Sequence, residues 1–109
     1  MKKADMAAGP PLVLTIKRKW FNLILSGEKK EEYREIKPYY ETRFRNLWRG
    51  SLIGGATERH IIFRNGYSAD SPKLLATVTI DTGDGREDWG AVPGVQYYRL
   101  HIKEVQLYE

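Results

Sequence analysis

Residues 26–38 of the chain read SGEKKEEYREIKP, and the interpretation of the whole first half starts from this stretch. Its polar composition is typical of a solvent-facing surface. It follows the apolar run WFNLIL, residues 20–25, which predicts a short helix over residues 17–26. Gly27 stands where that helix needs a left-handed residue to end, a conformation that glycine adopts at little cost. The stretch therefore separates one element from the next.

The residues after Gly27 predict a short strand, in which alternate side chains lie on opposite faces. Glu32 and Arg34 then share one face of that strand. Lys29 lies at the joint between helix and strand, where the carbonyl end of the helix favours a cation. The pattern thus predicts an ammonium, a carboxylate and a guanidinium within a small volume. Two interpretations stay open: a ligand site, or an ion pair between Glu32 and Arg34 that only holds the strand.

Residues 27–34, GEKKEEYR, resemble the GxKxxExR signature of ASCH domains. Further blocks are similar to a branch of that family found in phages and bacteria: LTIK at 14–17, WF at 20–21, EYREIKPY at 32–39 and FRNGY at 63–67. The resemblance covers roughly residues 12–108. It implies a PUA-like β-barrel with helices at one end.

The periodicity of the remaining chain predicts an α+β fold of about five strands and two early helices, which fits a small, mostly antiparallel barrel. Trp20 is expected on the core-facing stripe of the first helix, and the second helix is expected over residues 39–49. In the last strand Glu104 breaks the apolar alternation, which predicts a β-bulge near Lys103 and Glu104. The glycine-rich residues 82–94 are expected to form a flexible connection. The expected strands cover residues 12–16, 30–35, 59–64, 73–81 and the segment around 98–107.

The composition fits one soluble globular domain, because 41% of the 109 residues are hydrophobic and 29% are charged. The chain has no cysteine, which excludes disulfides, thiol nucleophiles and zinc sites built on cysteine. His60 and His101 are too few for a metal site unless carboxylates complete it, so we expect no metal and no cofactor. The lack of disulfides fits a protein of the cytoplasm.

The first residues differ from the rest of the chain. Residues 1–11 contain an acidic residue and a Pro-Pro pair and no continuous apolar core, so we expect a disordered N-terminal tail and not a signal peptide. The ASCH-like domain is then expected over residues 12–109. No apolar run is long enough to predict a membrane span.

Basic residues concentrate in one third of the sequence. Residues 17–49 contain ten Lys and Arg against five Glu, a net charge of +5, so the rest of the chain, with a total of +4, is nearly neutral. Such a concentration favours a polyanionic partner, most commonly a nucleic acid. The alternative is a helix face that only keeps the protein soluble.

The first functional hypothesis is a cleft, centred on Lys29, Glu32 and Arg34, that binds RNA or a nucleotide-like ligand. Lys37 and Arg64 would add phosphate contacts, and aromatic faces would stack bases. Glu32 or a nearby amide would read the donor edge of a base. The residues expected in this role beyond the central three are Lys37, Tyr39, Arg64, Asn65, Tyr67 and Trp89. For Asn65 ordinary turn chemistry is the competing explanation.

The second hypothesis is hydrolysis in the same cleft, with Lys29 and Glu32 as candidate catalytic residues. One ASCH-like branch consists of acetylcytidine amidohydrolases, which have a nucleophilic threonine where this chain has Glu32. The resemblance therefore does not carry that mechanism over intact, although a carboxylate can act as a general base for water. Another member of the family is a ribonuclease, for which Tyr33, Tyr67 and Ser68 would offer hydroxyl groups.

A third hypothesis is a protein-interaction module. In this case the basic side chains of the second helix, Arg43, Arg45 and Arg49, would bind an acidic partner.

Overall fold

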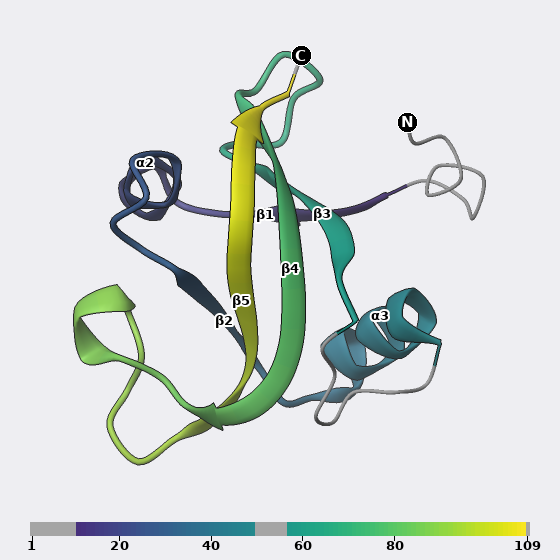
Figure 1. Ribbon diagram of the computed structural model, residues 1–109, viewed down its shortest axis with the longest axis vertical. Coiled ribbons are helices and arrows are strands. Elements are labelled where there is room, and N and C mark those ends of the chain that lie inside the picture. The colour runs from purple at the N-terminus through teal and green to yellow at the C-terminus, as the bar shows by residue number, and fades with distance from the viewer. Residues whose placement is uncertain (1–10, 50–56, 109) are drawn as a thin grey trace.

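The charged stretch forms the edge strand of a curved five-stranded sheet (Figure 1). The computed structural model describes residues 11–49 and 57–108. Helix α2, Arg18–Leu25, ends as predicted: Gly27 follows it with φ of +87°, and β2, Glu31–Glu35, begins after the turn. Within α2, the buried side chains are Phe21 and Ile24.

The five strands form a mixed sheet in the order β1-β3-β4-β5-β2. β1 runs parallel to β3, and the other neighbours are antiparallel. Figure 1 shows the long strands β4 and β5 bending along their length, so that the sheet curls into a half-barrel with α2 and α3 on opposite sides of the view. The predicted class is confirmed: α+β, with five mainly antiparallel strands and two helices in the first half. The remaining elements are β1 (Leu12–Thr15), α3 (Pro38–Trp48), β3 (Arg59–Arg64), β4 (Lys73–Asp84), the 3₁₀ helix η1 (Glu87–Trp89) and β5 (Gln96–Leu107).

The core lies inside the curl of the sheet. Alternate residues of β4 face it, and α3 covers it with Phe44 and Trp48, which are fully or almost fully buried. Phe44 packs edge to face against Tyr98 of β5, with ring centroids 5.2 Å apart. Burying such aromatic side chains stabilises a fold by about 1.5–3 kcal/mol each, so α3 is fixed mainly by this contact face. The core-facing residues of β4 are Leu74, Ala76, Val78 and Ile80.

The β-bulge predicted near Lys103 is present. Thr77 of β4 pairs with Glu104, whereas the next residue, Val78, pairs with Ile102. Lys103 is therefore the extra residue on β5. The slip returns Val105 to the core side of β5, as an inserted residue must when side chains alternate with a period of two.

Three features differ from the predictions or extend them. Trp20 is only half-buried and does not belong to the core cluster. β4 continues beyond residue 81 to Asp84, and the following connection contains η1, which packs onto the body of the protein and was predicted only as a flexible glycine-rich segment. The expected N-terminal tail, residues 1–11, lies outside the described residues except for Pro11. None of the described helices has the length and apolarity needed to cross a membrane.

Candidate functional site

Lys29 lies at the centre of the charged stretch and is almost completely buried, with 1% of its surface exposed. Its backbone N–H donates to the Leu23 carbonyl, which ties the residue to the end of α2. The ammonium donates to the carbonyl of Glu31 at 2.6 Å and to that of Trp89 at 2.9 Å, and lies 3.2 Å from Oε1 of Glu32. An ammonium has three N–H donors. All three therefore have acceptors within the protein.

Two aromatic rings enclose the same ammonium. Nζ of Lys29 lies 5.0 Å from the ring centroid of Trp20 and 5.0 Å from that of Tyr33. Burial lowers the pKa of Lys29, and the carboxylate of Glu32 opposes that shift. The lysine thus sits in a buried, partly aromatic enclosure, in which Glu32 is the largest of the charges that favour its protonated form.

Glu32 joins Lys29 to Arg34. Its second oxygen, Oε2, accepts from Nη2 of Arg34 at 2.7 Å and from Nε at 3.1 Å. The guanidinium also donates to the hydroxyl of Tyr40 at 3.2 Å and to the backbone carbonyl of Thr15 at 3.1 Å. Arg34 consequently connects β2 to α3 and to the end of β1. The convergence of the three charged side chains agrees with the sequence pattern, and we call them the inner triad.

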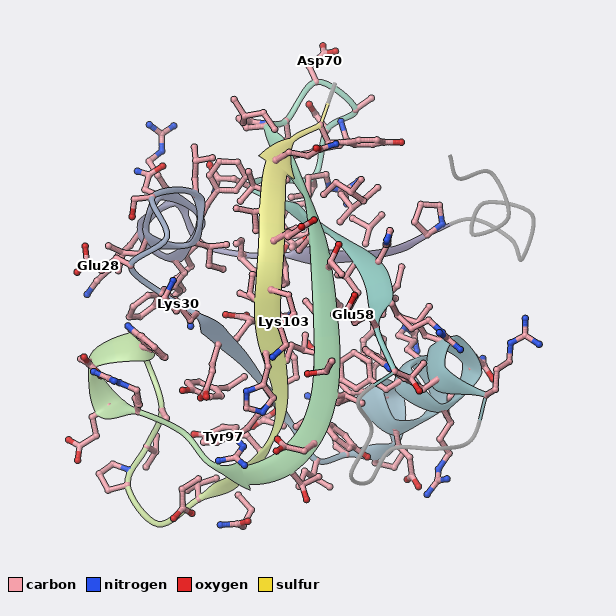
Figure 2. The ribbon with its side chains drawn as sticks, viewed as in Figure 1. Glu28, Lys30, Glu58, Asp70, Tyr97 and Lys103 are labelled. Carbon is pink, nitrogen blue, oxygen red and sulfur yellow. The ribbon has the colours of Figure 1, made fainter. Side chains whose placement is uncertain are left out.

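An open pocket of about 270 Å³ lies beside the inner triad, where the end of β1, α2, β2, α3 and the start of β5 meet. Glu32 and Arg34 form part of its wall, whereas Lys29 does not line it. One of the residues that line the pocket is Tyr97, at the start of β5, which is labelled in Figure 2. The pocket combines aromatic rings with charged groups of both signs. Its lining comprises Trp20, Tyr33, Tyr40 and Tyr97, the cations Lys17 and Arg34, the carboxylates Glu32 and Glu35, and Thr15 and Ile16.

Three other predicted ligand residues, Lys37, Asn65 and Arg64, do not line this pocket. Lys37 is exposed and pairs at 2.9 Å with Glu35, which lines the pocket. The side-chain amide of Asn65 donates to the carbonyl of Ile16 at 3.0 Å, behind the pocket wall. Arg64 donates to the carbonyl of Gly66 at 2.8 Å.

The two predicted stacking residues far along the chain are not at the pocket. Tyr67 is 86% exposed in the loop after β3 and does not line the pocket. Trp89 supplies its backbone carbonyl to Lys29, while its ring lies 4.2 Å from the guanidinium carbon of Arg86. Trp89 therefore contributes to the enclosure of the inner triad through its backbone.

Several pocket residues were not predicted from the sequence. The apolar pattern places Trp20 and Tyr40 in the core and assigns no role to Tyr97. Lys17 enters the sequence analysis only through the LTIK block, the start of the first helix and the net charge. Tyr40 is packed against the core by Phe44, 5.9 Å away, yet its hydroxyl reaches Arg34. The signal that could have identified it is its polar tip, because a half-buried tyrosine places its hydroxyl where a partner is available.

The opposite face of β2 carries a second charged cluster, the outer cluster. Nε2 of His101 lies 2.9 Å from Oδ1 of Asp81, and Nδ1 lies 3.3 Å from Oε2 of Glu31. Arg99 donates to both oxygens of Asp81, at 2.8 and 2.9 Å. The hydroxyl of Tyr33 donates to Glu31 at 2.7 Å, and burial raises the pKa of this phenol. The outer cluster thus spans β2, β5 and β4.

Among the residues that the structure describes, no group of three or more His, Asp or Glu side chains is arranged to hold a metal ion. Comparison of the chain with models of known protein families, with curated proteins and with solved structures gave no match. The resemblance to ASCH domains therefore stays a prediction from the motif.

Proposed function

We propose that the protein is an ASCH-like domain that binds RNA or a nucleotide-like ligand, with one base held in the pocket beside the inner triad. The observation that supports this proposal best is the composition of the pocket: four aromatic side chains and two cations line a space of about 270 Å³. Flat rings favour a planar base, and each base stacked on an aromatic ring gains about 1–3 kcal/mol. A cytoplasmic location, consistent with the absence of cysteine, is part of the proposal.

The charge of the pocket favours an anionic ligand. The inner triad carries two positive charges and one negative charge, and the exposed Lys17 adds another positive charge at the wall. Glu35 is paired with Lys37 and adds no net charge. A phosphate near Lys17 and Arg34 would gain charge-assisted hydrogen bonds. The residual acceptor capacity of Glu32 suits an amino or imino group of a base.

The geometry favours binding over hydrolysis. A catalytic Lys29 would have to reach the ligand, yet its ammonium is buried, holds three acceptors and does not line the pocket. We therefore assign Lys29 a positioning role, in which it fixes the carboxylate of Glu32 toward Arg34. The candidate hydrolase activity is tested together with binding.

The test compares two charge-removing variants of neighbouring residues. Lys17→Gln removes a cation from the pocket wall, whereas Arg18→Gln removes an equal charge from the first residue of α2, which does not line the pocket. We expect Lys17→Gln to weaken the binding of nucleoside monophosphates by about tenfold, because a hydrogen bond to a charged group contributes about 1.5–3 kcal/mol. Arg18→Gln should change the affinity little.

Binding is measured through the fluorescence of Trp20 at the pocket, with nucleoside monophosphates, short RNAs and acetylcytidine as probes. A Trp20→Phe variant identifies which part of the signal comes from this side chain. The same mixtures are analysed for hydrolysis products. Absence of binding by every probe would refute the proposal, as would equal losses in the two variants. Product formation would instead support the hydrolase.

A further inference from the structure

The pocket is small for a ligand site. Pockets that enclose a complete small-molecule ligand usually measure about 300–1,000 Å³, and this one measures about 270 Å³. If the proposed function holds, the pocket therefore accommodates one base, and the remainder of a larger ligand must lie on the neighbouring surface. Tyr40 indicates where that surface lies, because it lines the pocket and also packs against the exposed start of α3.

Tyr40 connects the pocket to the exposed start of α3. Tyr40 lines the pocket, and its ring also packs edge to face against the ring of Tyr39, with centroids 5.0 Å apart. Tyr39 is 54% exposed, so its aromatic side chain is accessible to a ligand. The exposed Tyr39 is thus the direct neighbour, in sequence and in space, of the pocket residue Tyr40.

Tyr39 carries an arginine on its ring. The guanidinium carbon of Arg43 lies 3.6 Å from the ring centroid, and Nη1 donates to the backbone carbonyl of Tyr39 at 3.0 Å. One turn of α3 separates the two residues, so the helix itself sets their spacing. The stacking and the hydrogen bond together hold the planar cation in one orientation. We call this pair the Tyr39–Arg43 platform.

Among the described residues, no carboxylate forms an ion pair with Arg43 of the platform. Elsewhere on α3 the exposed Arg45 forms an ion pair with Glu41 at 3.0 Å. For Arg43, by contrast, the contacts within residues 11–49 and 57–108 are a ring and a carbonyl oxygen. Arginine binds phosphate through its forked N–H donors, and its plane is a surface on which bases stack in single-stranded RNA. The guanidinium is held on Tyr39, which packs against the pocket residue Tyr40, and it has no carboxylate partner among the described residues. It therefore suits the next nucleotide of a chain.

We propose that the ligand is single-stranded RNA, with one base in the pocket and the adjoining nucleotide on the Tyr39–Arg43 platform. This inference rests on the proposed function and extends it from a nucleotide to an oligonucleotide. A duplex does not fit, because a base enters the pocket only when it is unpaired and unstacked. The platform supplies affinity and contact with the backbone, and the pocket holds the base.

The experiment compares ligands of two lengths. The full chain and the variants Arg43→Gln and Arg49→Gln are titrated with two sets of ligands. The first set is the monophosphates of adenosine, cytidine and uridine, and the second is the matching tetranucleotides. The second variant removes the same charge from the other end of the same helix, where Arg49 is exposed. Tyr39→Ala and Tyr39→Phe test the ring, since only the second keeps a surface for Arg43.

We expect the wild-type chain to bind a tetranucleotide at least about tenfold more tightly than the monophosphate, because one further stacked or phosphate-bound nucleotide is gained. Arg43→Gln and Tyr39→Ala should remove most of this gain and leave the monophosphate affinity unchanged, whereas Arg49→Gln and Tyr39→Phe should retain it. The tetranucleotide affinity is also measured between about 50 and about 200 mM salt. In a plot of the logarithm of the binding constant against the logarithm of the salt concentration, the slope for Arg43→Gln should be smaller in magnitude by about 0.7, as expected for one lost phosphate contact on a single strand.

Two outcomes would overturn the inference and can be told apart. If monophosphate and tetranucleotide bind with equal affinity, or if Arg43→Gln and Arg49→Gln have equal effects, the platform does not contact RNA although the pocket binds a nucleotide. If neither ligand binds to the wild-type chain, the proposed function fails as well, and an acidic protein partner for α3 becomes the leading hypothesis.

Discussion

β2 carries charged side chains on both faces, and the two faces differ in burial. On the inner face the side chains of Lys29, Glu32 and Arg34 are between 1% and 13% exposed. On the outer face, Glu31, Asp81, His101 and Arg99 are between 23% and 35% exposed. In both groups, cationic or imidazole nitrogens lie 2.7–3.3 Å from carboxylate oxygens. Similar chemistry on the two faces of one strand thus acts in two dielectric environments.

The difference shows that distance alone does not set the energetic weight of an ion pair. Charges that lose their water on burial must be fully satisfied inside the protein, and removing one partner leaves the others uncompensated. Exposed pairs keep much of their hydration and contribute little. The inner triad should therefore respond strongly to substitution, and the outer cluster weakly. Three substitutions test this expectation.

The largest effect is expected from Lys29→Met. The substitution keeps the volume of the side chain but removes the charge that Glu32 faces, and it leaves the carbonyls of Glu31 and Trp89 without their donor. Breaking a buried ion pair in this way costs about 3–5 kcal/mol. Chemical denaturation should show the loss directly as a lower free energy of unfolding.

The matched control is Lys30→Met. Lys30 is the next residue, is exposed and lies beside the turn between α2 and β2 (Figure 2). Its substitution should change the free energy of unfolding by no more than about 0.5 kcal/mol. Similar losses in both variants would contradict the distinction between buried and exposed charge. A large loss in Lys29→Met would make this variant unsuitable as a test of ligand binding, because unfolding would also lower the affinity.

The second substitution, Arg34→Lys, keeps the charge and changes the shape of the cation. Lysine can still pair with Glu32 but cannot also reach the Tyr40 hydroxyl and the Thr15 carbonyl, because only the guanidinium presents a fork of donors. We expect a loss of about 2 kcal/mol in the free energy of unfolding. Tyr40→Phe removes one of these acceptors and should cost about 1 kcal/mol or less. If Arg34→Lys lowers the free energy of unfolding no more than Tyr40→Phe does, the hydrogen bond from Arg34 to the Thr15 carbonyl of β1 does not contribute to stability.

The smallest effect is expected in the outer cluster, from Asp81→Asn. Burial acts to raise the pKa of Asp81, but hydrogen bonds from Arg99 and His101 outweigh it and hold the pKa below its usual value of about 3.9. Because the folded-state pKa is the lower one, the carboxylate stabilises the protein above about pH 4 and loses this effect as the pH falls through the folded-state pKa.

The free energies of unfolding of wild type and Asp81→Asn should therefore differ by about 1 kcal/mol or less at pH 7, as is usual for partly exposed pairs. The difference should shrink as the pH falls through the folded-state pKa of Asp81, because the carboxyl group then becomes uncharged like the amide. Denaturation curves at several pH values provide the measurement. A difference that grows on acidification would mean that the carboxylate is not stabilised by its partners.

The local part of this architecture could be read from the sequence. Gly27 ends α2, Glu32 and Arg34 share one face of β2, and the broken alternation at Glu104 locates the bulge at Lys103. Each of these features depends on residues a few positions apart, where helix and strand periodicity decide the geometry. The charged stretch was informative for the same reason.

What the sequence did not reveal are the partners that come from far along the chain. The carbonyl of Trp89 reaches Lys29 across 60 positions, and that of Thr15 reaches Arg34 across 19. Backbone carbonyls occur at every residue, so composition and periodicity carry no signal for which of them will accept a hydrogen bond. Trp20 illustrates the same difficulty, because its place on an apolar stripe does not distinguish the core from an aromatic pocket wall.

The hydrogen bond between Arg34 and Thr15 joins the two edges of the half-barrel far less extensively than its central strands are joined. β1 and β2 are the two edges of the sheet, and between them one guanidinium donates to one carbonyl, whereas β4 and β5 are joined along eleven residue pairs. Parting the edges there breaks a hydrogen bond from a charged donor, about 1.5–3 kcal/mol, and leaves every strand pairing intact. Since Thr15 and Arg34 both line the pocket, the hydrogen bond that joins the two edges of the sheet also forms part of the pocket wall.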